Sequence, residues 1–400
     1  MIIGENRVRT RSIVVSAATA ALTTGIVGLL AARGVPGAAL RTEPLRVSGS
    51  GASFEDADTA GFSMLAVSWN EPGHALDGEI RVRTKSVATG AWSPWTVLGT
   101  ERGEGVRGVS EPLWAGPSDG VEVKVAGHGG ALPAGLRLDL VDPGADPAGA
   151  GPGAGDDTVP AAFGAAPAVP AARSAAARPD IVSRSAWGAR EQPGDDPVYG
   201  KEVKAVFVHH TAQTNAYDCT DSAALLRGLQ ELHVRTNGWK DLGYNFVVDK
   251  CGTVFEGRRG GADRPVTGAH TLGFNTDTMG IAVIGEYSSQ EPSGAAMNAV
   301  ARLAGWKLGR YGYDPQGSVT LTSGLDNGTF RTGQGARFER ISGHRDAFST
   351  ECPGTLLYRR LPDIRSRAAD PLGGSLTGPL TDPLGGSLDG LVGSLAGQRG

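Results

Sequence analysis

The chain lacks the residue patterns of several large classes of protein. Only three cysteines are present and none forms a Cys-x-x-Cys pair, which excludes zinc fingers, zinc ribbons, thioredoxin-like motifs and disulfide-rich scaffolds. No run of basic residues occurs, and 38 Lys plus Arg against 42 Asp plus Glu leave a net charge of −4, so no nucleic acid partner is expected. The absence of a His-Glu-x-x-His string also argues against an ordinary zinc peptidase.

Aromatic residues are scarce as well, at 6%, whereas the 61 glycines and 24 prolines are abundant. This content of glycine and proline is too high for a chain that folds as one continuous domain. A hydrophobic content of 40% is in turn too high for a chain that is disordered throughout. Because 400 residues exceed the length of an average domain, we expect two folded units joined by linkers.

Residues 1–40 have the features of an export signal. Arg7, Arg9 and Arg11 precede an uncharged apolar stretch over residues 12–32, which is followed by small residues. The stretch is longer than the core of most signal peptides, so an uncleaved N-terminal membrane anchor stays open beside a cleaved signal peptide. In both cases the rest of the chain is expected to be secreted, extracellular or associated with a cell wall.

Residues 41–144 are predicted to form a small all-β, sandwich-like domain. Short segments of strand-forming residues are separated by Gly, Pro, Asp and Ser turns. The predicted strands are residues 62–69, 80–84, 92–98, 121–125 and 136–141. Trp92 and Trp95 are interpreted as packing residues rather than as a sugar-binding platform.

Two segments are predicted to be flexible. Residues 145–178 consist mainly of Ala, Pro and Gly and cannot bury enough surface to offset their chain entropy, so they are interpreted as a linker. Residues 370–400 contain the heptapeptide Asp-Pro-Leu-Gly-Gly-Ser-Leu twice and are interpreted as a low-complexity Gly/Leu/Pro tail.

Residues 179–369 alternate short apolar strands with amphipathic helical patterns. Strands are predicted at residues 205–208, 244–248, 254–256 and 280–284, and helices around residues 225–232, 297–308 and 357–364. The alternation predicts an α/β domain with a central mixed sheet and helices on its faces.

Candidate metal ligands gather in this α/β domain, which holds five of the seven histidines and all three cysteines. His209 and His210 follow a predicted strand, at the edge where α/β sheets place ligands, and His344 precedes Cys352 by eight residues. Two imidazoles and one thiolate leave a fourth position on zinc for water or substrate, as in catalytic sites. Taken alone, these residues also allow an interpretation without a metal, in which His344 is a surface histidine and Cys352 a buried thiol.

The remaining cysteines are expected to pair. Cys219 and Cys251 flank the helix and the strand that follow His209, and two such cysteines normally form a disulfide in an exported protein. Cys352 would then be the odd thiol, and metal coordination would keep it as a protected thiolate.

Several motifs resemble the family of peptidoglycan recognition proteins and zinc-dependent N-acetylmuramoyl-L-alanine amidases, the type 2 amidases. The resemblance covers residues 181–362, and residues 41–144 are similar to the accessory domain of secreted bacterial members. The motifs are Ser-Arg-Ser-Ala-Trp-Gly-Ala-Arg at 183–190, Val-His-His-Thr at 208–211, Asp-Leu-Gly-Tyr-Asn-Phe at 241–246, Gly-Ala-His-Thr at 268–271, Gly-His-Arg-Asp at 343–346 and Cys-Pro-Gly at 352–354.

The resemblance implies a function and a cofactor. The activity is hydrolysis of the amide bond between N-acetylmuramic acid and L-alanine, in cell-wall turnover or lysis, with Zn²⁺ as cofactor and peptidoglycan as partner. By resemblance, His209, His344 and Cys352 are the zinc ligands, Tyr244 is the catalytic tyrosine and Thr350 assists it. We expect a monomer that contacts a membrane only if the N-terminal segment is uncleaved.

The resemblance leaves the substrate contacts less defined. His270 and Arg258 are candidate substrate-binding residues, whereas Arg259-Gly260 matches neither dipeptide with which animal members distinguish stem peptides. The alternative function is a non-catalytic peptidoglycan-binding protein. Since binding-only members commonly replace the metal cysteine with serine, Cys352 favours the enzyme.

Overall fold

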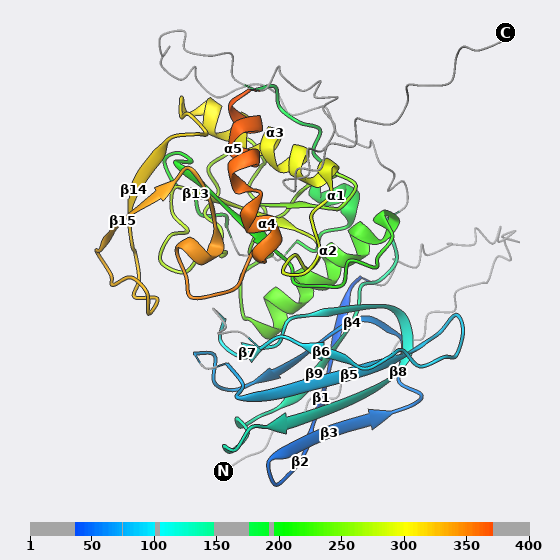
Figure 1. Ribbon diagram of the computed structural model, residues 1–400. Coiled ribbons are helices and arrows are strands. Elements are labelled where there is room, and N and C mark those ends of the chain that lie inside the picture. The colour runs from blue at the N-terminus through cyan, green and yellow to red at the C-terminus, as the bar shows by residue number, and fades with distance from the viewer. Residues whose placement is uncertain (1–36, 74, 101–104, 148–175, 192–195, 371–400) are drawn as a thin grey trace, which may run out of the picture. The chain divides into compact units, whose positions relative to one another are not determined.

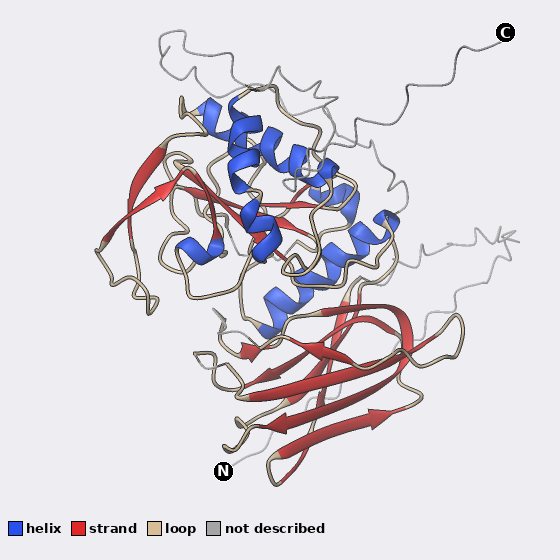
Figure 2. Cartoon of the chain, viewed as in Figure 1, coloured by secondary structure: helices blue, strands red, loops and turns tan. Residues whose placement is uncertain are grey.

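The computed structural model describes residues 37–73, 75–100, 105–147, 176–191 and 196–370 (Figures 1 and 2). Contacts divide the chain into two compact units, residues 1–34 and 35–400. The first unit, most of the predicted export signal and linker, and the tail after Asp370 lie outside the described residues. Among the residues described, no helix is both long and apolar enough to cross a membrane.

The N-terminal domain is all β, as predicted, and begins with β1 just before the predicted boundary at residue 41. Its antiparallel sheet has the order β1-β9-β4-β8-β3-β2, with β5 also on β8. The long β8 pairs with β4 through its first half and with β3 and β5 through its second half, so the sheet folds over itself. The strands are β1 (Ala39–Pro44), β2 (Arg46–Ser48), β3 (Gly51–Asp56), β4 (Phe62–Trp69), β5 (Gly78–Ser86), β6 (Thr96–Leu98), β7 (Gly108–Val109), β8 (Leu113–Gly127) and β9 (Arg137–Asp142).

Strand β4 is buried along its whole length because both of its faces are covered. Leu65, Val67 and Trp69 pack inside the β domain, whereas Met64 and Ala66 belong to a core that includes residues of the C-terminal domain. Because successive side chains of a strand point to opposite faces, the side chains of β4 enter two separate hydrophobic cores.

Trp92 and Trp95 lie before β6, which is shorter than the strand predicted at residues 92–98. The guanidinium carbon of Arg83 lies 5.0 Å from the Trp92 ring centroid and 4.9 Å from that of Trp95. The Lys124 ammonium lies 4.8 Å from the Trp95 centroid. These cation–π contacts pack charged side chains of β5 and β8 against the two rings, and Trp95 is 37% exposed.

The C-terminal domain has the predicted mixed sheet, with the order β12-β11-β13-β10-β16 and only β12 antiparallel to its neighbour. Two helices take the place of the one helix predicted around residues 357–364, and they are separated at Arg360. Pro362 lies in the first turn of the second helix, where proline is tolerated. The elements are α1 (Arg184–Trp187), β10 (Ala205–His210), η1 (Cys219–Asp221), α2 (Ser222–Glu231), η2 (Leu232–Thr236), β11 (Phe246–Val248), β12 (Val254–Glu256), β13 (Thr278–Val283), α3 (Gly294–Arg310), β14 (Ser318–Thr322), β15 (Gly335–Glu339), β16 (Ile341–Gly343), η3 (His344–Asp346), α4 (Thr355–Arg359) and α5 (Leu361–Ala369).

Strand β10 shows how the sheet separates its two faces. Val206 and Val208 pack into the core that includes α3 and α5, on the face that these helices cover in Figure 1. Ala205 and Phe207 point to the other face. Alternation therefore places the next residue, His209, on the face that α3 and α5 leave uncovered.

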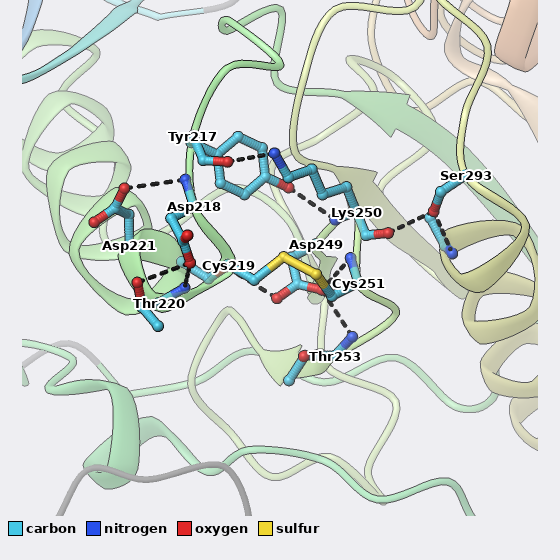
Figure 3. Close-up of a disulfide and its surroundings, with 12 residues drawn as sticks. Tyr217, Asp218, Cys219, Thr220, Asp221, Asp249, Lys250, Cys251, Thr253 and Ser293 are labelled. Carbon is cyan, nitrogen blue, oxygen red and sulfur yellow. Dashed lines mark hydrogen bonds between the residues drawn. A yellow bond between two sulfur atoms is a disulfide. The ribbon is translucent and has the colours of Figure 1, made fainter.

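The predicted disulfide between Cys219 and Cys251 is confirmed (Figure 3). Asp249 holds the turn beside it, because its Oδ1 accepts hydrogen bonds from the backbone N–H groups of Cys251 at 3.0 Å and Thr253 at 2.8 Å. Cys352 is the cysteine outside this bond, and it is buried.

Candidate metal centre and substrate cleft

The two histidines of the candidate metal centre are brought together by neighbouring parallel strands. Val208 of β10 is in register with Gly343 of β16, so His209 and His344 follow at the same level. Their ring centroids lie 4.5 Å apart. The carboxyl ends of parallel strands thus place residues 135 positions apart in the sequence at one edge of the sheet.

Cys352 completes the cluster after η3 turns the chain back toward β10. The backbone N–H of Arg345 donates to the carbonyl of Cys352 at 3.0 Å, and that of His210 lies 3.4 Å from its sulfur. One ligand atom from each of His209, His344 and Cys352 lies within 4.8 Å of the others. Two imidazoles and one thiol at this separation fit the donor set of a tetrahedral zinc ion with one open position.

The surroundings of His209 keep its ring neutral. Burial, reinforced by His344, His270 and His210, lowers the pKa of His209 well below its usual value. Neutral imidazole is the form that binds a metal. Nδ1 of His209 lies 3.7 Å from the Cys352 sulfur, whereas its Nε2 faces Nδ1 of His270 at 3.2 Å.

His270 is held rigidly beneath the cluster. It lies over Gly280 of β13, where a Cβ atom would come within 2.4 Å of the imidazole Cγ, so only glycine leaves room for the ring. Its Nδ1 also lies 3.0 Å from the Thr271 hydroxyl, and its buried Nε2 has no hydrogen-bond partner among the described residues. Burial lowers the pKa of His270 to about 3.

Tyr244 and Thr350 lie beside the three candidate ligands. The Tyr244 ring centroid is 5.2 Å from that of His209. The Thr350 hydroxyl accepts a hydrogen bond from the backbone N–H of Cys352 at 3.1 Å. The structure therefore brings six of the seven candidate site residues, His270 included, into one cleft.

Arg258, the other candidate substrate-binding residue, lies elsewhere. Its Nη1 donates to the carbonyl of Leu242 at 3.1 Å, and its side chain lines a smaller cavity beside Lys307. It is not among the residues that line the cleft with the candidate ligands.

The cleft has a volume of about 190 Å³. Its lining includes two residues that the motifs did not single out as site residues, His233 and Trp239. Nδ1 of His233 accepts a hydrogen bond from the backbone N–H of Gly243 at 3.1 Å, and burial lowers the pKa of His233 to about 3. The lining also includes residues of the β domain that no sequence motif marked, namely Gly105, Arg107 and residues 109–112.

Comparisons with known proteins agree with this arrangement. Residues 199–355 match the family described as N-acetylmuramoyl-L-alanine amidase, and residues 31–159 match one described as Rv3811 N-terminal galactose-binding domain-like. The peptidoglycan-recognition protein SC2 of Drosophila simulans is 31% identical over 183 residues, which are 45% of this chain and 84% of that protein. The human N-acetylmuramoyl-L-alanine amidase is 33% identical over 183 residues, but the match spans only 27% of its length.

Solved structures that match part of this chain include Drosophila PGRP-LB, at 26% identity and a TM-score of 0.36, over 46% of this chain and 92% of that one. A second is peptidoglycan recognition protein-LE, solved in complex with tracheal cytotoxin, at 31% identity and a TM-score of 0.35 over the same shares.

Proposed function

Because this chain belongs to the family of peptidoglycan recognition proteins and N-acetylmuramoyl-L-alanine amidases, we propose that it is a zinc-dependent amidase. Its substrate is peptidoglycan, in which it hydrolyses the amide bond between N-acetylmuramic acid and L-alanine. It acts outside the cell, in the turnover or lysis of a cell wall. The convergence of His209, His344 and Cys352 in one cleft is the observation that carries this proposal.

His209, His344 and Cys352 would hold the zinc ion. When bound, zinc supplies an activated water at neutral pH and polarises the scissile carbonyl. His209 has its Nδ1 toward Cys352, so with zinc on Nδ1 the proton of its ring would be on Nε2 and would be donated to Nδ1 of His270. That hydrogen bond fixes both the tautomer and the orientation of the ligand ring.

The hydroxyl of Tyr244 has the role of orienting the attacking water and donating a hydrogen bond to the oxyanion of the tetrahedral intermediate. Thr350 holds the Cys352 backbone through the hydrogen bond at its Oγ1 and adds a hydroxyl at the same edge of the cleft. His270 presents its Nε2–H as a further donor toward substrate. A neutral ring is suited to this role because the low pKa of His270 keeps it uncharged at neutral pH.

Incubation with purified sacculi tests the activity. Cleavage should release peptides that carry new L-alanine amino termini, and Cys352→Ser should release none. Elemental analysis of the same samples should find zinc in the wild type only.

The rival function is non-catalytic binding of peptidoglycan. If the wild-type protein binds sacculi and retains zinc but releases no such peptides, the protein is a peptidoglycan-binding protein and the proposed amidase activity is wrong.

A further inference from the structure

The helical segment beside the cleft ends in a π-helical turn. η2 follows α2 directly, and the backbone N–H of Asn237 at its end donates to the carbonyl of Leu232 at 3.0 Å. π-Helical turns are rare and occur frequently at functional sites. η2 carries His233, which lines the cleft. The position of η2 therefore decides where the His233 ring lies in the cleft.

His233 contacts the segment that carries Tyr244. Its Nδ1 accepts a hydrogen bond from the backbone N–H of Gly243, the residue before Tyr244, at 3.1 Å. Its ring also meets the Tyr244 ring edge to face, with 5.6 Å between the two centroids. Because one side chain makes both contacts, a shift of η2 would be passed through His233 to the Tyr244 ring.

The end of η2 is held by the β domain. The hydroxyl of Thr236, the last residue of η2, donates to Oδ2 of Asp139 in β9 at 3.1 Å. Both residues are fully buried. A hydrogen bond to a carboxylate is stronger than one between neutral groups, and breaking a buried one leaves its acceptor without a donor. This contact therefore resists any displacement of the end of η2.

Asp139 is in turn fixed inside the β domain by other donors. The hydroxyl of Ser68 donates to its Oδ2 at 2.8 Å, and that of Thr42 donates to its Oδ1 at 2.9 Å. Nε of Arg137 lies 3.2 Å from the same Oδ1. A buried carboxylate held by this network cannot follow a helix that moves, so it anchors the end of η2 in one place.

Other contacts keep the two domains together when the Thr236 hydroxyl is removed. Met64 of β4 packs on Gly228 of α2, where a Cβ atom would lie 2.8 Å from Cε of Met64. Arg227 of α2 donates through Nε to the carbonyl of Pro143 at 2.7 Å and pairs through Nη2 with Asp146 at 2.6 Å. The loss of one hydroxyl therefore tests the anchor of η2 and not the docking of the β domain.

We propose that Asp139 and Thr236 are positioning residues of the candidate active site. The hydrogen bond between them holds η2 in the place from which His233 fixes Gly243 and the Tyr244 ring. Neither residue lines the cleft, so both act through His233. The β domain thereby supports the geometry of a site whose candidate metal ligands all lie in the other domain. The catalytic role of Tyr244 rests on the proposed function, whereas the link from Asp139 to Gly243 does not.

Amide hydrogen exchange at Gly243 measures this link, because the hydrogen bond to His233 protects its N–H. Thr236→Val removes the hydroxyl and keeps the size of the side chain, so exchange should become roughly fivefold faster or more, the effect of one lost hydrogen bond. Thr236→Ser keeps the hydroxyl, loses a buried methyl group and should exchange like the wild type. Thr42→Val is the matched control, because it removes a donor from the same carboxylate within the β domain, and it should leave exchange unchanged.

Turnover of muropeptides gives a second readout. Thr236→Val should lower kcat by about fivefold or more while KM and zinc content stay at wild-type levels, because a displaced Tyr244 hydroxyl weakens contacts made only in the transition state. Thr236→Ser and Thr42→Val should keep the kcat of the wild type. A rise in KM with unchanged kcat in Thr236→Val would contradict a role through Tyr244 and overturn the positioning.

Thermal melting shows which variants fold, and Thr236→Ala takes the place of Thr236→Val if the latter does not. Wild-type exchange at Gly243 in the variant without the hydroxyl would overturn the proposal, as would an equal acceleration in Thr236→Ser or Thr42→Val. The exchange measurement needs no turnover. A wild type that cleaves no muramoyl amide would therefore overturn the proposed function, while exchange still decides on the link from Asp139 to Gly243.

Discussion

The sulfur of Cys352 lies 3.7 Å from Nδ1 of His209, although 143 positions separate them in the chain. The parallel register of β10 and β16 brings His344 to the same place. The cluster is therefore assembled from segments that are distant in the sequence, and two of its ligands lie at the ends of neighbouring parallel strands.

Removal of any one ligand should empty the metal centre. We expect the wild type to hold one zinc per chain, and His209→Ala, His344→Ala or Cys352→Ser to lose both the metal and the activity, because two protein ligands retain zinc poorly. Elemental analysis after dialysis measures the metal. His128→Ala, a change of an exposed histidine in the β domain, is the control and should keep wild-type zinc. Full zinc occupancy in Cys352→Ser would refute the ligand assignment.

The disulfide should contribute to stability without affecting the metal. Cys219 and Cys251 are 32 positions apart, and closing a loop of this length stabilises the fold by about 3 to 4 kcal/mol in the chain-entropy model. The double variant Cys219→Ala/Cys251→Ala should lower the free energy of unfolding by about this amount, as measured by urea denaturation. Its zinc content should stay at the wild-type level, and a variant as stable as the wild type would contradict the estimate.

Sequence reasoning identified the parts of the site that local patterns encode. An apolar strand followed by His209, and the stripe of Leu225, Leu229 and Leu232, were sufficient to predict β10 and α2. The motif around Cys352 supplied the third ligand. The strands and helices depend on residues close together in the chain, which is why the fold class was predictable from local patterns. The choice of His209, His344 and Cys352 as one ligand set came from the resemblance of the motifs to the amidase family.

Features that depend on distant contacts were not predictable. α2 continues into the π-helical η2, in which His233 is buried, and no local sequence pattern showed that this residue lines the cleft. The role of Met64 could not be read from β4, because an alternating strand does not reveal what covers each face. For the same reason, the sequence did not show that residues 109–112 of the β domain line the cleft.

Stability should depend on pH through Lys307, which is 1% exposed and donates to the carbonyls of Ala262 and, at 2.9 Å, Arg264. Burial lowers the pKa of Lys307 from 10.5 to about 7. Between these values the unfolded chain holds the proton that the folded chain has lost, so the free energy of unfolding rises with pH. Below about pH 7 both states are protonated and the cost of the buried charge is present in full.

Urea denaturation near pH 7 and near pH 9.5 measures this effect. The wild type should gain on the order of 3 kcal/mol more than Lys307→Met over that range. Lys201→Met, a change of an exposed lysine, should follow the wild type. Equal pH dependence in the wild type and Lys307→Met would mean that the two carbonyls keep Lys307 charged.

The last prediction separates the chemistry of the cleft from metal binding. Tyr244→Phe removes only a hydroxyl, so the ring contact with His209 and the three candidate ligands remain. If that hydroxyl stabilises the oxyanion, kcat should fall by about 10²- to 10³-fold while zinc content and binding to sacculi stay at wild-type levels. Tyr313→Phe, which removes a hydroxyl bonded to Glu202 outside the cleft, should keep its activity. Near-normal turnover in Tyr244→Phe would make the tyrosine structural, and loss of zinc together with activity would mean that it supports the ligands instead of the transition state.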